Sequence, residues 1–428
     1  MNSADAPLDV RALIARGEVE THFQPITSIR RQNVLGLEAL ARGRRDGSLV
    51  SPGELFEQAH AQNLTSDLDL LCRNIALSSF SPLGTAQDGL MLFVNMHPIT
   101  TQLGDHVGEL ERTVREAGLE PNRVVIELLE VAFDAPEKAL QLVHRLRSAG
   151  FLIALDDVGV GHSNLDRIAQ IRPDILKADR SLLDGIDTDY VKREVFKSLV
   201  VLSERIGGWI IAEGIETQAQ ALAVLELGGD LMQGFYFARP APLKDEELPS
   251  LERVNECGRA FKEQTLGRIL SNRRRYGARI ETLTSLLDTL RRAPVSEFEP
   301  LLRERSSEFP RIESACILDD RGEQVCDTVL FSPAPLAQRK SVMFAPPARG
   351  TDHSFKEYFY LLSEARLNPF VTETYVPLPS GDLCVTLTTF VRCALGDNYV
   401  LVVHFKAELE ELCQTDRRNG RDQNEPLN

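Results

Sequence analysis

Acidic and amide side chains end or follow one apolar segment after another in the N-terminal half of the chain. They are Glu38, Asn95, Glu127, Glu130, Asp156, Asp157, Glu213 and Glu216, while the amide Gln233 opens the segment QGFYF. One lysine, Lys177, has the same placement. Carboxylate and amide oxygens are hard ligands, which suit Mg²⁺ or Mn²⁺ better than zinc. If the fold brings these side chains together, they cannot all stay ionised without cations, so the pattern predicts a metal-dependent site.

The apolar segments themselves read as buried strands, because they are short, nearly continuous and separated by helical stretches of mixed polarity. They are Val34–Leu40, Met91–Val94, Val124–Leu129, Phe151–Leu155, Ile175–Leu176, Trp209–Ala212 and Phe235–Phe237. This alternation predicts an α/β fold with a parallel sheet, either a (β/α) barrel or a doubly wound sheet. No GxGxxG motif follows an early strand, and a length of about 240 residues suits a barrel. A barrel would gather the polar residues at one mouth, where the carboxyl ends of its strands meet.

The composition argues against several classes of function. The 428 residues carry 48 Lys and Arg against 63 Asp and Glu, a net charge of −15. Binding to a nucleic-acid polymer or to an anionic membrane surface needs clustered positive charge, so neither is expected. No segment reaches the roughly 18 apolar residues of a membrane span, and the N-terminus lacks a signal-peptide pattern. The seven cysteines are scattered without a CxxC pair, which predicts a reduced, cytoplasmic chain without a disulfide framework or structural zinc.

Periodicity alone leaves the reaction open, because one metal ion with a lysine also fits enolase-type or aldolase-type barrels. The motifs are more specific when they are taken in order. Residues 10–245 resemble the EAL family of cyclic di-GMP phosphodiesterases through FQPI (23–26), EALAR (38–42), FVNMHP (93–98), IELLE (126–130), ALDDVGVGHSNL (154–165), DILKADRSLL (174–183), IAEGIET (211–217) and QGFYFARP (233–240). The resemblance implies a (β/α)8-type TIM-like barrel that hydrolyses one phosphodiester of cyclic di-GMP to linear 5′-pGpG.

The same resemblance assigns roles to individual residues. It implies two divalent ions, Mg²⁺ or Mn²⁺, the first held by Glu38, Asn95, Glu127 and Asp156 and the second by Asp156, Asp157 and Glu213. The catalytic group would be Glu38, Lys177 and Glu213, in which Lys177 orients the attacking water and Glu213 is a metal ligand or a general base. Substrate contacts would come from Gln24, Arg42 and Gln233, with Arg42 on a phosphate. Glu130 and Glu216 would support the metal-site loop and its ligands.

The loop after Asp157 departs from the family's usual DDFGTGYSSL-like sequence. Its positions hold Val158, Val160, His162 and Asn164, while Ala41 and Gly43 replace bulkier residues after the EAL triplet. None of these is an expected metal ligand, but the loop substitutions bear on turnover and dimer coupling. Two alternatives to an active enzyme therefore stay open. One is an EAL receptor that binds cyclic di-GMP without cutting it, and the other is a scaffold whose C-terminal domain contacts a partner protein.

The rest of the chain has a different sequence pattern. A connecting helix is expected over about 250–293, where an apolar stripe follows heptad spacing at Tyr276, Ile280, Leu283, Leu287 and Leu290. From about 297 to 412, strand–turn–strand patterns with helices only near 297–306 and 354–366 predict an α+β domain. This domain resembles the PAS-like or Cache-like sensors that follow EAL domains, which implies a small-ligand pocket with Tyr358 and Lys356 as candidates. A homodimer is the expected assembly, and dimerisation without any ligand is equally compatible.

Overall fold

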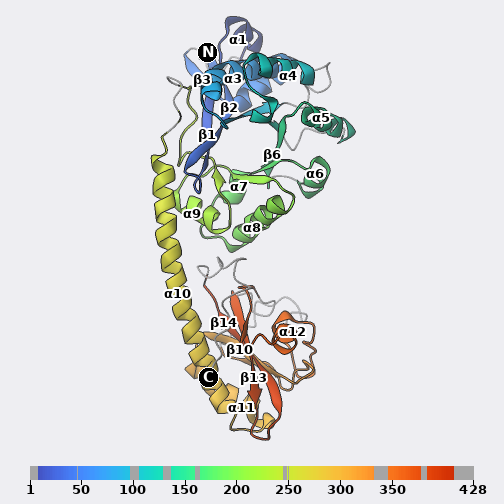
Figure 1. Cartoon of the computed structure of the whole chain (residues 1–428), viewed down its shortest axis with the longest axis vertical. Coiled ribbons are helices and arrows are strands. Elements are labelled where there is room, and N and C mark those ends of the chain that lie inside the picture. The colour runs from blue at the N-terminus through green and yellow to red at the C-terminus, as the bar shows by residue number, and fades with distance from the viewer. Residues whose placement is uncertain are drawn as a thin grey trace, which may run out of the picture. The chain divides into compact units, whose positions relative to one another are not determined.

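Eight strands in the N-terminal half of the chain hydrogen-bond in a closed ring, and Figure 1 draws this part of the chain in blue to green. They are β1 (Val19–Ser28), β2 (Asn33–Arg45), β4 (Met91–Met96), β5 (Val124–Leu128), β6 (Leu152–Val158), β7 (Ile175–Ala178), β8 (Trp209–Ala212) and β9 (Leu231–Met232). Their order around the ring is β1-β9-β8-β7-β6-β5-β4-β2, and β2 closes the ring by pairing with β1. The expected TIM-like barrel is therefore confirmed.

The computed structural model describes residues 8–45, 47–96, 106–128, 136–159, 164–243, 248, 250–331, 346–376 and 383–408. The chain divides into two compact units, Met1–Glu263 and Gln264–Asn428. The barrel belongs to the first unit, and each unit has a hydrophobic core of its own.

The first strand of the barrel was not among the predicted strands. β1 runs antiparallel to both of its neighbours, β2 and β9, whereas the other neighbouring strands of the ring are parallel. Its sequence, VETHFQPITS, mixes polar and apolar residues, and yet all but one of them are buried. Because polar residues interrupt its apolar ones, a search for apolar runs does not find this strand. The barrel thus begins with an antiparallel hairpin, which the short strand β3 (Ser48–Val50) extends by pairing with β2.

The prediction of a last strand at Phe235–Phe237 is wrong, because the chain turns directly after Gln233. A Cβ atom at Gly234 would lie 2.1 Å from the carbonyl oxygen of Ile215, so only a glycine allows this close approach. The N–H of Tyr236 then donates to the same Ile215 oxygen at 2.9 Å, which fixes the turn. Tyr236 and Phe237 pack from this turn against the core outside the barrel instead of lying in the sheet.

Among the described residues, helices and a 3₁₀ turn connect these strands, and the helices that follow the parallel strands cover the outside of the barrel (Figure 1). They are α1 (Val10–Arg16), α2 (Pro52–Ala61), α3 (Thr65–Ala86), α4 (His106–Glu116), η3 (Pro121–Arg123), α5 (Pro136–Ser148), α6 (Asn164–Ile171), α7 (Arg180–Leu183), α8 (Tyr190–Arg205) and α9 (Gln218–Glu226). Side chains at the N-caps fix where several of them start. Asp179, Asp189 and Thr217 accept hydrogen bonds from the first backbone N–H groups of α7, α8 and α9.

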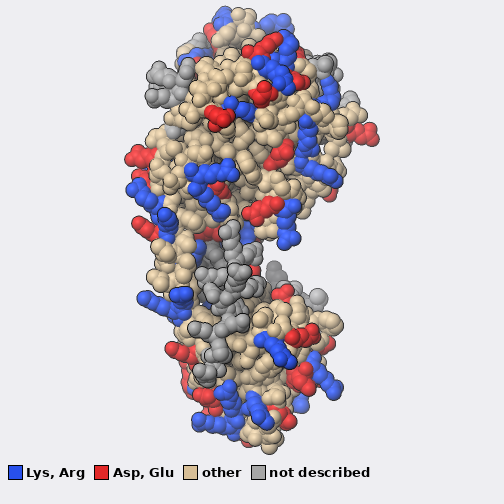
Figure 2. All heavy atoms as spheres, in the orientation of Figure 1, with Lys and Arg blue, Asp and Glu red and all other residues tan. Residues whose placement is uncertain are grey.

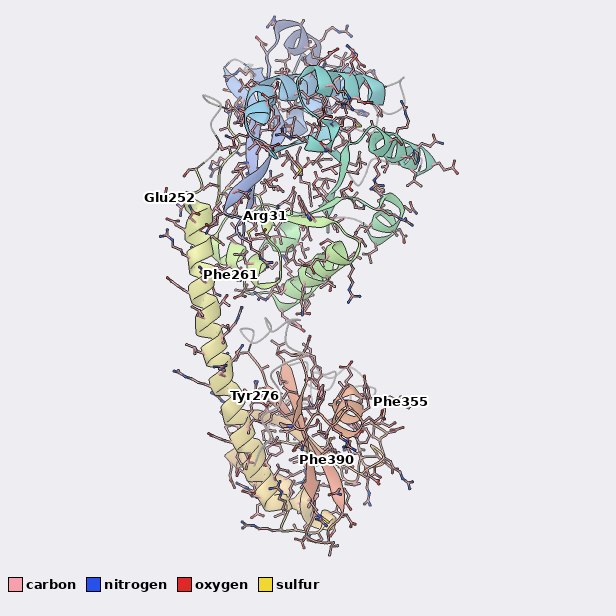
Figure 3. The ribbon with its side chains drawn as sticks, in the orientation of Figure 1. Arg31, Glu252, Phe261, Tyr276, Phe355 and Phe390 are labelled. Atoms are coloured by element: carbon pink, nitrogen blue, oxygen red, sulfur yellow. The ribbon has the colours of Figure 1, made fainter. Side chains whose placement is uncertain are left out.

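One long helix, α10 (Glu252–Leu290), continues from the barrel unit into the second unit. Near its start Cys257 is buried in the core of the first unit, and Phe261 packs against that core. Near its end Leu283 and Leu290 are buried in the core of the second unit. Tyr276, labelled with Phe261 in Figure 3, is 45% exposed, so the predicted apolar stripe is covered only in its C-terminal part.

The second unit is an α+β fold, as predicted. Its strands are β10 (Ile312–Leu318), β11 (Val329–Leu330), β12 (Phe370–Val371), β13 (Cys384–Arg392) and β14 (Asn398–Lys406), all antiparallel in the order β11-β10-β14-β13-β12. Its other elements are α11 (Phe298–Glu304), α12 (Glu357–Ser363) and the 3₁₀ turns η5 (Val295–Glu297) and η6 (Arg305–Glu308). Alternating side chains pack one face of the sheet on α10 and α11 and the other face on α12. The predicted Pro-Ser-Gly-Asp turn lies outside the described residues.

Charged side chains on the face drawn in Figure 2 are of mixed sign over both units. Several are paired along one helix, as in the Arg112–Glu116 contact of 3.0 Å on α4. Such interspersed charges do not form an extended basic track on this face. In the part of the chain that the structure describes, the apolar stretches of the helices are too short or too polar to span a membrane.

Candidate active site

The polar residues at the strand ends stand one step beyond the apolar layer inside the barrel. That layer includes Phe93, Val125, Ala154, Ile175, Ile211 and Leu231. Two positions after each of these come, in the same order, Asn95, Glu127, Asp156, Lys177, Glu213 and Gln233. Side chains two positions apart on a strand point to the same face, so these polar groups continue the interior of the barrel at its mouth. On the antiparallel strand β1 the order is reversed, and Gln24 precedes the interior residue Ile26.

Lys177 lies at the centre of this group. Its Nζ is 2.7 Å from Glu127 Oε1 and 2.7 Å from Glu213 Oε1. It is also 3.4 Å from Asp156 Oδ1 and 3.5 Å from Glu38 Oε1. The Lys177 side chain is 1% exposed, so the pairing takes place away from water. One buried ammonium therefore faces four carboxylates, which leaves three negative charges uncompensated when all of them are ionised.

Burial and this excess of negative charge shift the pKa values of the site. Burial raises the pKa of Glu213 to about 8, and Asp156 and Glu38 add to the rise while Lys177 opposes it. Burial and then the Glu38 carboxylate raise the pKa of Glu127 well above its ordinary value, against Lys177. Burial alone would lower the pKa of Lys177, but the four carboxylates outweigh it and raise that pKa well above its usual value. Protonated glutamic acids or added cations are needed to balance the site.

Amide side chains hold two of these carboxylates from the side. Asn95 Nδ2 donates to Glu127 Oε2 at 3.0 Å. Gln233 Nε2 donates to Glu38 Oε2 and, at 3.0 Å, to Gln24 Oε1. Gln24 Nε2 donates in turn to the backbone oxygen of Ala238 at 3.0 Å. The structure thus joins the predicted substrate-binding residue Gln233 directly to the glutamate of the EAL triplet, and Gln24 to it by way of Gln233.

An irregularity in β6 lets two consecutive acids stand at the strand end. The pairing of β6 with β7 shifts register between Leu155 and Val158. Within that shift Asp157 has a φ of 56°, in the left-handed region that aspartate tolerates better than most residues. A regular strand points successive side chains to opposite faces, whereas a bulge redirects them. The N–H of Asp157 also donates to Asp156 Oδ1 at 3.0 Å, which ties the two acids together.

The donor chemistry of the site fits a divalent cation. Glu38, Asn95, Glu127 and Asp156 offer carboxylate and amide oxygens, the ligands that Mg²⁺ and Mn²⁺ prefer. Within the described ranges no three acids, histidines or cysteines are already gathered as a metal-binding group. The ammonium of Lys177 lies among these carboxylates instead and compensates part of their negative charge, which helps the cluster to stay buried. Added cations would supply the positive charge that Lys177 alone does not.

A pocket of about 430 Å³ opens beside the carboxylates. It is lined by Glu38, Asn95 and Asp156 from the site and by parts of β2, α2 and α3. Asp69 and Arg73 of α3 form an ion pair in its wall, although they are only 2% and 4% exposed. The sequence interpretation missed this pair. Its signal was an acid and an arginine four residues apart in a leucine-rich helical stretch, a spacing that places both on one helix face.

The remaining predicted residues lie farther out. Regular pairing of β2 with β4 ends at Ala39, so Arg42 stands on the part of β2 that projects past that pairing. Burial lowers the pKa of Arg42, and the Glu38 carboxylate opposes this fall. Glu216 pairs with Arg180 at 2.8 Å.

The loop residues can be placed only in part. Val158 is buried at the end of β6, with 1% exposed. Glu130, Val160 and His162 lie outside the described residues, and so does the side chain of Asn164.

Some known proteins resemble about half of this chain, and others resemble most of its length. Cyclic di-GMP phosphodiesterase RocR of Pseudomonas aeruginosa is 29% identical over 238 residues, which cover 55% of this chain and 60% of that protein. This chain therefore covers less than two thirds of that relative. The uncharacterized EAL-domain containing protein YkuI of Bacillus subtilis is 25% identical over 395 residues, 89% of this chain and 93% of that protein.

Solved structures extend the comparison. The crystal structure of YkuI in complex with substrate c-di-GMP and calcium covers 94% of this chain and 99% of that chain, with a TM-score of 0.75 and 24% identity. The shared fold thus includes the C-terminal unit. A calcium/cy-diGMP complex of Klebsiella pneumoniae BlrP1 at pH 8.0 covers 54% of this chain and 57% of that chain, with a TM-score of 0.50 and 29% identity.

The family itself is defined by the barrel unit. Residues 8–240 match the EAL domain family. This segment is more than half of the chain and contains the strand-end carboxylates, Lys177 and both glutamines. The chain belongs to the EAL domain family.

Proposed function

We propose that this protein hydrolyses cyclic di-GMP to linear 5′-pGpG in a metal-dependent reaction. The observation that carries the proposal is the convergence of Glu38, Glu127, Asp156 and Glu213 on Lys177 at the barrel mouth. Relatives named as cyclic di-GMP phosphodiesterases, RocR among them, support the choice of substrate. The complex of BlrP1 with calcium and cyclic di-GMP supports both the substrate and a divalent cation.

The proposed cofactors are two divalent ions, Mg²⁺ or Mn²⁺. Glu38, Asn95, Glu127 and Asp156 would hold one of them, and Asp156, Asp157 and Glu213 the other. Ions in such a site supply Lewis acidity and make water a nucleophile at neutral pH. The excess of carboxylates over the single ammonium supports this assignment.

The side chains of the protein position the substrate and handle the proton. Arg42 offers a guanidinium fork to a phosphate. Gln24 and Gln233, held against Glu38, would contact the dinucleotide beside the reacting phosphate. The pocket of about 430 Å³ has a volume in the usual range for small ligands.

The proton on the attacking water needs an acceptor near neutral pH. Lys177 would orient that water by donating a hydrogen bond from its buried ammonium. Glu213 has a pKa raised to about 8 by burial. In the role of general base, which is the alternative to metal ligation, Glu213 would accept this proton, because its Oε1 lies 2.7 Å from Lys177 Nζ, beside the group that would orient the water.

A receptor that binds cyclic di-GMP without cutting it is the second candidate. Two observations favour it. The loop after Asp157 carries Val158, Val160, His162 and Asn164 in place of the family's usual residues. In addition, oxygens of Glu127 and Glu213 already form ion pairs with Lys177 at 2.7 Å, so a metal ion would compete with the ammonium for these two ligands.

We further propose that the C-terminal unit is a PAS-like or Cache-like sensor that regulates the barrel of a cytoplasmic homodimer. A buried polar group beneath α12 supports a ligand-sensing role. There Tyr358 Oη is 2.6 Å from His353 Nδ1, and His404 Nδ1 is 2.7 Å from Thr386 Oγ1. We propose Tyr358 as a ligand contact because it belongs to this polar group, whereas Lys356 is exposed.

Product analysis tests the proposal. The purified chain is incubated with cyclic di-GMP and Mg²⁺ or Mn²⁺, with EDTA as a control, and the nucleotides are separated. We expect metal-dependent 5′-pGpG from the wild type and none from Glu38→Ala. Tight binding without product would make the chain a receptor, and wild-type turnover by Glu38→Ala would refute the site assignment.

A further inference from the structure

A second ion pair joins the loops that follow β7 and β8. Arg180 comes three residues after Lys177, and Glu216 comes three residues after Glu213. Arg180 Nη1 lies 2.8 Å from Glu216 Oε1, while Lys177 Nζ lies 2.7 Å from Glu213 Oε1. β7 and β8 are direct neighbours in the barrel. The two site residues are therefore followed, at the same spacing, by a pair that ties their loops together.

The stem of Arg180 lies against the backbone immediately after Glu213. Gly214 has a φ of 67°, and a Cβ atom there would come within 2.5 Å of Arg180 Cβ and 2.6 Å of Arg180 Cγ. The absence of a side chain at Gly214 thus allows the arginine stem to press directly on the loop. The N–H of Glu213 donates to the carbonyl oxygen of Ala178 at 3.0 Å, so the loop leaves β8 in register with β7.

The other end of the same loop is anchored to α9. The N–H groups of Glu216 and Thr217 donate to Gln220 Oε1 at 2.9 and 3.1 Å. Thr217 in turn caps α9 by accepting from the N–H of Gln220 at 3.2 Å. Because the Glu216 backbone is fixed to α9 and its carboxylate to Arg180, the segment 213–217 is held from both sides.

We propose that Arg180 is a positioning residue, which holds Glu213 in place relative to Lys177 by way of Glu216 and Gly214. This inference rests on the proposed metal-dependent hydrolysis. The side chains of Arg180 and Glu216 are 58% and 39% exposed, so their pair contributes little to stability. Its effect is on geometry, because a catalytic group displaced by about 1 Å can lose about a hundredfold in rate.

Substitutions at Arg180 distinguish an effect on the geometry of the active site from an effect on the stability of the protein. For Arg180→Ala we expect kcat to fall about tenfold and the Mn²⁺ midpoint for thermal stabilisation to rise about tenfold, as for other residues that support metal ligands. KM should stay within about twofold, and the melting temperature without metal within about 2 °C, because the pair is exposed. Arg180→Lys, which keeps the stem and the charge, should recover most of both losses.

A charge swap and a matched control complete the experiment. The double variant Arg180→Glu with Glu216→Arg should be more active than either single variant. Arg112→Ala removes an exposed arginine of similar pairing, 3.0 Å from Glu116 on α4, and should change neither kcat nor the Mn²⁺ midpoint.

Three results would overturn the proposal. One is an Arg180→Ala protein with wild-type kcat and Mn²⁺ midpoint. Another is a large fall in its melting temperature without metal, which would make the pair structural. The third is a raised KM with no recovery in the double variant, which would place Arg180 on the substrate itself. If the wild type makes no 5′-pGpG, the proposed activity fails, and the Mn²⁺ midpoints alone then decide whether Arg180 positions Glu213.

Discussion

Lys177→Met removes the buried positive charge and keeps most of the side-chain volume. In the metal-free protein the carboxylates of Glu127 and Glu213, each 2.7 Å from the ammonium, would then face each other without compensation. Removing one partner of a buried ion pair costs about 3–5 kcal/mol. Since both glutamates already have raised pKa values and can take up a proton, we expect the lower end, about 3 kcal/mol near pH 7.

The assay is thermal unfolding with and without a divalent cation. For a unit of this size, about 3 kcal/mol corresponds to a melting temperature lower by about 6–12 °C in EDTA. Mg²⁺ or Mn²⁺ brings the missing positive charge to the same oxygens, so the cation should stabilise Lys177→Met more than the wild type. A suitable control is Lys192→Met, because among the described residues Lys192 Nζ donates to backbone oxygens, those of Ser181 and Asp184 at 2.8 and 2.6 Å, and not to a carboxylate.

Two results would refute this reasoning. If Lys177→Met melted like the wild type in EDTA, the ammonium would not be what balances the carboxylates. If the variant were destabilised but gained nothing from the cation, the carboxylates would not be metal ligands. Loss of turnover in Lys177→Met would by itself decide neither point, since the lysine is also the proposed water-orienting group.

Three further predictions follow from the same geometry. The pKa of Glu213 rises from 4.5 to about 8 on folding. In EDTA the free energy of unfolding should therefore fall by up to about 1.4 kcal/mol per pH unit as the pH rises from 4.5 to about 8. A free energy of unfolding that stays constant from pH 5 to 8 would contradict this prediction. Gln233→Ala removes the hydrogen bond to Glu38. Initial rates should show KM raised about fivefold to tenfold, with a smaller change in kcat. An unchanged KM would exclude a substrate contact by Gln233. Gly234→Ala would place a Cβ 2.1 Å from the Ile215 oxygen and should lower the free energy of unfolding by about 2 kcal/mol or more, whereas an unchanged denaturant midpoint would show that the turn can relax.

The strand ends were predictable because two constraints coincide there. A parallel strand buried on both faces leaves a continuous apolar run, and the residue that continues its inward face at the mouth is free to be polar. Val125 and Glu127 show the pattern, as do Ile211 and Glu213. Apolar runs alone would have placed these acids at one barrel mouth, whereas the choice of metal, substrate and individual roles came from the family resemblance.

The parts that the sequence did not predict are those where a buried position is polar or a strand is very short. β1 places His22, Gln24 and Thr27 in buried positions, which no hydrophobic pattern reports. β9 has two residues and ends where Gly234 passes Ile215, a contact distant in sequence. The position of Lys177 among the carboxylates likewise depends on long-range packing, so the sequence indicated its presence at the site but not its ion pairs.

A count of charges connects these ion pairs with the proposed number of metal ions. Five carboxylates stand at the strand ends, from Glu38, Glu127, Asp156, Asp157 and Glu213, and Lys177 brings one positive charge. One divalent ion would still leave two negative charges in a largely buried site, whereas two ions bring the sum to zero.

The same count of charges indicates a role for Arg42 in substrate binding. A phosphodiester adds one negative charge to a site that two ions and Lys177 have already neutralised. The arginine, on the part of β2 that projects past its pairing with β4, supplies the matching positive charge only where the substrate enters. Arg42→Ala should therefore weaken substrate binding without changing the Mn²⁺ midpoint for thermal stabilisation. A shifted midpoint in that variant would mean that Arg42 already belongs to the charge balance of the metal site and that the count is wrong.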